Sequence, residues 1–153
     1  MALRQIRIMG DKVLEKKCRE VTEVTPRIRE LIQDMLETMY DADGVGLAAP
    51  QVGILRRIVV IDVGEGPIVM INPEILETEG SQTGSEGCLS LPGQAGTVTR
   101  PNYVKIRALD ENMEESSEIQ VPVRGFHLDI QNCGEYIPHI FAQAESVVEV
   151  CKR

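Results

Sequence analysis

The strongest pattern of hydrophobic and polar positions lies between residues 26 and 42. Apolar and aromatic side chains recur there at intervals of three and four residues, the spacing of one helical face. They are Ile28, Leu31, Ile32, Met35, Leu36, Met39 and Tyr40. Thr25 can cap the first free amides, Pro26 suits the first helical position, and Gly44 lies where a left-handed residue is expected to end the helix. We therefore predict a helix over residues 26–42.

Runs of β-branched residues follow this helix. Residues 57–63 and 68–72 are rich in valine and isoleucine, and Gly64 and Gly66 supply a turn between them, so we expect a hairpin. Three further strands are predicted over residues 74–79, 96–99 and 103–109, separated by turns at Gly80-Ser81, Pro92-Gly93 and Pro101-Asn102. This succession indicates an α+β fold with mostly antiparallel sheets around a helix.

The last third of the chain has a less regular pattern. Gly125, Gly134 and Pro138 interrupt it, so we expect no continuous helix through residues 121–140. Beyond Pro138 one apolar helical face predicts a short terminal helix. Its members are Ile140, Phe141, Ala144, Val147, Val148 and Cys151. We predict a single domain over residues 1–153 with an atypical C-terminal segment.

Composition and charge exclude several classes of protein. The 153 residues suffice for one domain with a hydrophobic core, and the net charge of −8 comes without a basic cluster that could neutralise phosphates. No apolar run approaches the roughly 20 residues that span a bilayer. The N-terminal residues lack the apolar region of a secretory signal. We therefore expect no direct nucleic-acid binding, no membrane association and a cytoplasmic location.

The four cysteines are widely separated, which favours reduced thiols over a disulfide framework. They are Cys18, Cys88, Cys133 and Cys151. Cys88 differs from the others because it lies in the punctuated segment Glu86-Gly-Cys-Leu-Ser90. Its thiolate could bind a metal ion, or it could act as a nucleophile if a base lay beside it.

A second segment with candidate chemistry, Gly44-Val-Gly-Leu-Ala-Ala-Pro-Gln51, follows the predicted helix. Its small residues allow tight packing beside a site, and the Gln51 side chain can both donate and accept hydrogen bonds. Alone, it could be a helix end followed by a buried turn. The two segments, in this order and about 40 residues apart, resemble the first two signature motifs of the peptide deformylases, and the resemblance extends over residues 3–109.

The resemblance implies a metallohydrolase that removes the N-formyl group from nascent formyl-methionyl peptides, with the ribosome as the place of encounter. Cys88 matches the family's metal-binding cysteine. The metal is normally iron(II), with zinc, nickel or cobalt as substitutes. Gln51 and the backbone N–H of Leu89 match two donors to the oxyanion that forms as water attacks the formyl carbon.

Further positions match the family around this centre. The backbone at Val45, Gly46 and Gly87 would lie along the bound peptide, which pairs like an added strand. Glu86 and Arg100 match an ion pair that orients the cysteine loop. A surface ion pair without a functional role is the alternative interpretation of the Glu86–Arg100 match.

The family's third motif, His-Glu-x-x-His, is absent from the sequence. In deformylases it supplies two metal ligands and the general base. This chain stops matching at about residue 115, and its two histidines, His127 and His139, lack the motif's spacing. A site made by Cys88, Cys133 and one histidine is conceivable. Two alternatives therefore stand beside a deformylase: a catalytically inactive, deformylase-like peptide-binding protein, and a metal-free hydrolase that uses the Cys88 thiol.

Overall fold

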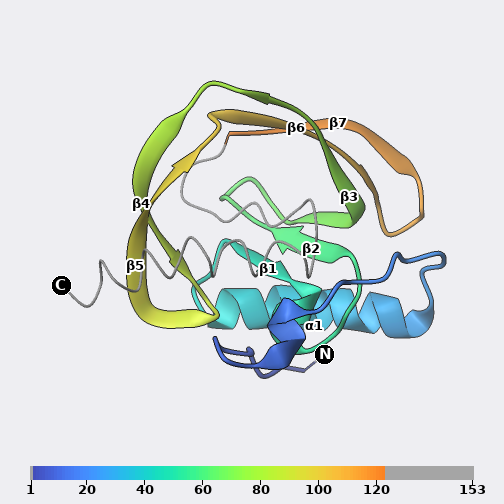
Figure 1. The fold of residues 1–153 in the computed structure, drawn as a ribbon. Helices are drawn as coiled ribbons and strands as arrows, with labels where there is room; N and C mark the ends of the chain where they lie inside the picture. The colour runs from blue at the N-terminus through green and yellow to red at the C-terminus, as the bar shows by residue number, and fades with distance from the viewer. Residues whose placement is uncertain (1, 123–153) are drawn as a thin grey trace.

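The computed structural model describes residues 2–122 (Figure 1). In chain order the elements are the short 3-10 helix η1 (Lys12–Glu15), helix α1 (Pro26–Asp41), strand β1 (Gly46–Ala48), the short 3-10 helix η2 (Ala49–Val52), and strands β2 (Ile58–Ile61), β3 (Ile68–Glu79), β4 (Gln82–Cys88), β5 (Leu91–Arg100), β6 (Tyr103–Leu109) and β7 (Glu115–Pro122). The predicted α+β class with antiparallel sheets is confirmed. The helix predicted beyond Pro138 lies outside the described residues.

Helix α1 begins and ends close to the predicted residues. The hydroxyl of Thr25 accepts a hydrogen bond from the Ile28 N–H at 3.3 Å, and Pro26 occupies the first turn. The left-handed helix end predicted at Gly44 is wrong, because Asp43 adopts that conformation with a φ of 53°. A side chain at Gly44 would instead collide with Leu89, so close packing is what requires glycine there.

A five-stranded antiparallel sheet lies above the helix, with the strand order β1-β2-β3-β6-β7. The predicted hairpin is confirmed, since Ile58 pairs with Ile71 and Ile61 pairs with Ile68. The strand predicted over residues 74–79 is the second half of β3, which continues with two shifts of register against β6. Figure 1 shows α1 beneath β1 and β2, with β6, β7 and the end of β3 at the top of the view.

Strands β4 and β5 pair with each other in a separate two-stranded sheet, the arm at the left of Figure 1. The turn predicted at Pro92-Gly93 is wrong, because both residues lie within β5. The pairing register shifts there, between Gly87 and Cys88 of the opposite strand. Such a bulge bends a hairpin and re-aims its side chains, in this case next to Cys88.

Apolar side chains of α1, β1 and β2 fill the space between helix and sheet. Met35, Met39 and Ile58 are fully buried in this cluster. Cys18 belongs to a second buried cluster, and within the described residues Cys18 and Cys88 form no disulfide. Cys133 and Cys151 lie outside the described residues. Within residues 2–122, no helix has the length and apolar character that a membrane crossing requires.

Candidate active site

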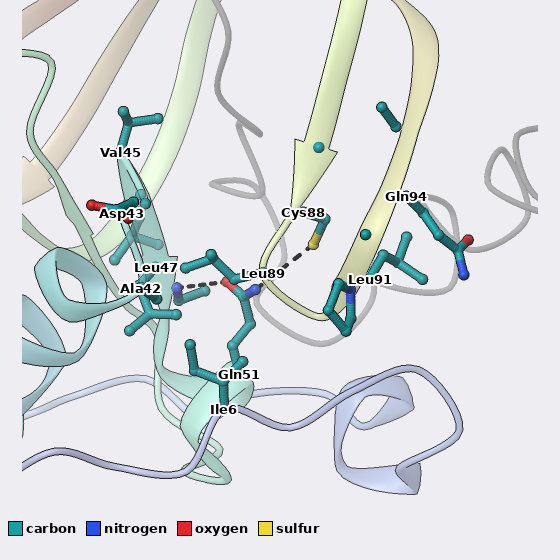
Figure 2. A pocket seen from close by; sticks show the side chains of 18 residues that line it. Ile6, Ala42, Asp43, Val45, Leu47, Gln51, Cys88, Leu89, Leu91 and Gln94 are labelled. Atoms are coloured by element: carbon teal, nitrogen blue, oxygen red, sulfur yellow. Dashed lines mark hydrogen bonds between the residues drawn. The ribbon is translucent and has the colours of Figure 1, made fainter. Parts of the chain in front are cut away.

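A pocket of about 710 Å³ opens between the segment that follows α1 and the β4–β5 hairpin. Both sequence motifs contribute to its wall, although they are far apart in the chain. Six of the eight predicted site residues line it, namely Val45, Gly46, Gln51, Gly87, Cys88 and Leu89. Figure 2 shows the first motif on one side of the pocket and the hairpin that carries Cys88 on the other.

Gln51 is positioned by the turn in which it lies. It belongs to η2, which follows directly on β1, and only 9% of the residue is exposed. Its Oε1 accepts a hydrogen bond from the Ala48 N–H at 3.0 Å, and its Nε2 lies 3.8 Å from the sulfur of Cys88. The donor end of this side chain therefore faces the thiol across the pocket (Figure 2).

Cys88 and Leu89 come from the end of β4 and the turn after it. Both are half-buried. An added Cβ at Gly44 would lie 2.6 Å from Leu89 Cδ1, so the glycine of the first motif allows the leucine of the second to pack against it. Among the lining residues of the described chain only Asp43 is charged, and it is exposed. The other polar side chains in the pocket wall are uncharged ones, namely those of Gln51, Cys88 and Gln94.

An N-terminal segment that was not predicted from the sequence forms hydrogen bonds with both motifs. The Arg7 N–H donates to the Gln51 carbonyl at 2.7 Å, and the Met9 N–H donates to the Ser90 carbonyl at 2.9 Å. Ser90, at the end of the second motif, also accepts a hydrogen bond on its hydroxyl from Gln51 Nε2 at 3.1 Å. The place of Ser90 within the second motif could have identified it as a site residue. Residues 7–9 carry no comparable signal in the sequence.

Asp34 of α1 anchors this N-terminal segment. Its carboxylate accepts hydrogen bonds from the Ala2 N–H at 2.7 Å and from Arg4 Nε at 2.9 Å, and only 3% of the residue is exposed. Burial alone would raise the pKa of Asp34, but these hydrogen bonds outweigh burial and hold that pKa below its ordinary value. The helix, the N-terminal segment and both motifs therefore form one connected network.

Two further predicted residues lie in the β4–β5 hairpin. Glu86 lies in β4 and Arg100 lies in the paired strand β5. Their backbones face different partners, since Glu86 pairs with Gly96 and Arg100 pairs with Gln82. Their side chains are outside the described part of the structure, so the ion pair stays a prediction.

The metal ion implied by the sequence resemblance needs more ligands than these residues offer. Residues 2–122 contain no group of three or more His, Cys, Asp or Glu side chains that could hold a metal ion. Cys88 is a suitable soft donor, but a catalytic tetrahedral site takes three protein ligands and an open position. The two histidines of the sequence, His127 and His139, lie outside the described residues. The described part of the chain thus supplies one suitable metal ligand and does not supply a complete metal centre.

Comparison with known proteins agrees with this geometry. A family model of polypeptide deformylase matches residues 3–127. The peptide deformylase of Agathobacter rectalis is 76% identical over 115 residues, which cover 75% of this chain and 73% of that protein.

Solved structures are similar over the same region. The peptide deformylase of Thermotoga maritima has a TM-score of 0.76 and 42% identity, covering 79% of this chain and 82% of that one. The peptide deformylase of Synechococcus elongatus, solved in complex with actinonin, has a TM-score of 0.73 and 40% identity. The match covers 77% of this chain and 65% of that one. With sequence and structure in agreement over most of its length, this chain belongs to the polypeptide deformylase family.

Proposed function

We propose that the pocket binds N-formyl-methionyl peptides and that the chemistry for which it is shaped is hydrolysis of the N-formyl group. Family membership supports this reaction, since deformylases are metal-dependent hydrolases that remove this group. The observation that carries the proposal is the meeting of the two motifs, where the amide nitrogen of Gln51 lies 3.8 Å from the sulfur of Cys88.

Gln51 and Leu89 are proposed as donors to the formyl oxygen. As water adds to the formyl carbon, negative charge develops on that oxygen, and N–H groups already aimed at it stabilise the transition state. One such donor contributes about 3 kcal/mol in other hydrolases. The buried position of Gln51 and its bond from Ala48 support this role, because a held amide does not need to reorient during the reaction.

The peptide itself is proposed to bind along β1. In the described sheet β1 pairs on one side only, with β2, so its other edge can accept an added strand. Val45 and Gly46 line the pocket at the start of β1, and Gly87 of β4 lines it as well, and these are the positions for which the sequence resemblance implies substrate binding. A similar deformylase has been solved in complex with actinonin, which supports ligand binding by this fold.

The metal is proposed to be iron(II), with zinc, nickel or cobalt as substitutes, and residues 2–122 offer it Cys88 alone. The sequence lacks the His-Glu-x-x-His that would supply two more ligands and a base. We therefore expect turnover far below that of a deformylase with all three motifs. This absence favours a second candidate function, which is binding of formyl peptides without hydrolysis. Encounter at the ribosome and a cytoplasmic location stay predictions.

Three measurements on one preparation separate these functions. They are binding of formyl-Met-Ala-Ser by calorimetry, release of formate, and metal content. Metal with turnover supports the deformylase, whereas binding without either supports the peptide-binding protein. Turnover without metal that disappears in Cys88→Ser would support the thiol hydrolase.

The peptide-binding step has its own control. Gln51→Ala should weaken the complex by roughly tenfold, the loss of one good hydrogen bond to the formyl oxygen. Gln33→Ala removes an exposed glutamine of α1 and should leave affinity unchanged. If the wild-type chain binds no formyl peptide, the proposed function is wrong.

A further inference from the structure

The Gln51 carboxamide contacts Ser90, which is not among the residues that line the pocket. Ser90 lies in the turn between β4 and β5 and is 2% exposed. Its hydroxyl oxygen accepts a hydrogen bond from Gln51 Nε2 at 3.1 Å. A buried hydroxyl of the second motif is thus directed at a buried amide of the first.

The backbone of Ala48 fixes the opposite end of the same carboxamide. A backbone N–H can only donate, so the Gln51 atom that faces it at 3.0 Å must be the oxygen. The nitrogen therefore points toward the second motif, where two acceptors are available, Ser90 Oγ at 3.1 Å and Cys88 Sγ at 3.8 Å. Because a thiol is a weak acceptor, the hydroxyl provides the stronger contact.

Residues 7–9 also connect Gln51 to Ser90, through backbone hydrogen bonds that do not involve the Ser90 hydroxyl. Arg7 donates to the carbonyl of Gln51, and Met9 donates to the carbonyl of Ser90. Gln51 and Ser90 are therefore linked twice, once by their side chains and once through the N-terminal segment. Loss of the hydroxyl alone should change the direction of the Gln51 amide and leave the two backbones where they are.

We propose that Ser90 is a positioning residue for formyl recognition. By accepting one N–H of Gln51, it leaves the other N–H directed toward the sulfur of Cys88 at 3.8 Å, and we expect the oxygen of a bound formyl group to accept that N–H in place of the weaker sulfur acceptor. Ser90 acts through Gln51 and not on the peptide. This inference rests on the proposed function, because it concerns how a formyl group is held in this pocket.

The first test monitors the side-chain amide of Gln51 directly, in the absence of a ligand. The side-chain amide signals of the full chain are recorded by ¹⁵N NMR, and those of Gln51 are assigned by their loss in Gln51→Ala. In Ser90→Ala we expect these signals to move toward the values of a solvated glutamine. Ser90→Thr keeps a hydroxyl and should restore them, and Ser85→Ala, an exposed position of β4, should change nothing. Unchanged Gln51 signals in a folded Ser90→Ala variant would overturn the proposal.

The second test measures formyl recognition as a ratio of affinities. Formyl-Met-Ala-Ser is compared with its desamino-methionyl counterpart, which lacks the formamide group. We expect the wild-type chain to favour the formyl peptide by roughly tenfold, the discrimination that one good hydrogen bond provides. Ser90→Ala should reduce this ratio toward one without lowering the affinity for the desamino peptide. Ser90→Thr should preserve the wild-type ratio.

The double variant decides whether Ser90 acts through Gln51. If it does, Gln51→Ala and Gln51→Ala/Ser90→Ala give the same ratio, because the two residues form one unit. Losses that add would show that Ser90 acts independently and would overturn the inference. Failure of both peptides to bind the wild-type chain would refute the proposed function instead, and the Gln51 signals would still decide whether Ser90 orients the amide.

Discussion

Gly44 sets the position of a functional neighbour by having no side chain. A Cβ there would lie 2.6 Å from Leu89 Cδ1 and 3.3 Å from Leu89 Cγ, so Gly44→Ala must displace the leucine side chain. The end of a leucine side chain is flexible, and the fold should survive. The backbone N–H of Leu89 should shift with it. We expect calorimetry to show a roughly tenfold loss of affinity for formyl-Met-Ala-Ser, the cost of one misplaced donor.

Gly84→Ala is the matched control for this change. Gly84 lies in β4, and an added Cβ there meets no heavy atom within 4 Å. Affinity should stay at the wild-type value. Equal affinities for Gly44→Ala and Gly84→Ala would show that the position of Leu89 does not matter for the peptide.

Cys88 should be the more reactive of the two described cysteines. It is half-buried at the pocket, whereas Cys18 is 5% exposed within the core. Thiol reactivity depends on exposure and on the local field when no metal ion holds the sulfur. Iodoacetamide should therefore modify Cys88 well before Cys18 in the native chain, as read from peptide masses. Protection of Cys88 that ends only when a chelator is added would contradict this.

At the scale of elements, Asp34 couples α1 to the N-terminal segment and gives it a pH dependence. The pKa of Asp34 in the folded chain is lowered by the Ala2 and Arg4 hydrogen bonds, which outweigh burial. The folded state therefore binds this proton less readily than the unfolded state does. The stabilisation is fully present above the unfolded pKa of about 3.9 and is lost as the pH falls through the lower folded pKa.

Asp34→Asn should reveal this contribution. At pH 7 we expect it to lower the free energy of unfolding by about 1–3 kcal/mol, the range for a hydrogen-bonded charged group. The difference from wild type should shrink in urea titrations below pH 4, because the Asp34 carboxylate of the unfolded chain then takes up a proton more readily than that of the folded chain. Glu30→Gln changes an exposed carboxylate on the same helix and is the control. An equal difference at pH 7 and pH 3 would refute the assignment.

Elements with a strong apolar period were predictable, and elements without one were not. Helix α1 and strand β6 match the predicted ranges closely, because each buries one face against the core. Strands β1, β4 and β7 were missed. The first has three residues, and β4 is built from polar residues and glycine and pairs only with β5, so no buried face imposes an alternation on its sequence.

The same division holds within the site. Gln51, Cys88 and Leu89 were identified because they belong to continuous motifs. Ser90 was missed as a partner of Gln51 because the bond joins residues 39 positions apart, and residues 7–9 were missed because they contribute backbone groups. Side-chain type gives no signal for such contacts. Only the register of the folded chain brings them together.

In the molecule as a whole, the described residues supply the pocket proposed for the peptide, and the family's third motif is absent from the sequence. Mutation of a residue that hydrogen-bonds to a metal ligand typically lowers metal affinity roughly 10–100-fold. Loss of two imidazole ligands should lower the affinity well beyond this range. We expect less than one equivalent of iron or zinc after dialysis, measured by plasma mass spectrometry. A full equivalent that survives a chelator and disappears in Cys88→Ser would show that the chain supplies other ligands.

Repair of the missing motif would show whether the described residues already form the rest of a deformylase site. In a chimera, the residues after Pro122 are replaced by a continuous helix that carries Gln-His-Glu-Ile-Asp-His, so that all described strands are kept. Catalytic groups that act as a unit are strongly non-additive, so a variant with one of the two histidines should recover almost nothing.

The measurement is formate release from formyl-Met-Ala-Ser by the parent chain, the single-histidine variant and the chimera. We predict rapid release by the chimera alone, because the pocket, Gln51, Cys88 and Leu89 are already in place. A parent chain as active as the chimera would contradict the claim that the third motif is functionally missing. A chimera that folds and binds one equivalent of metal but releases no formate would contradict the roles assigned to the first two motifs.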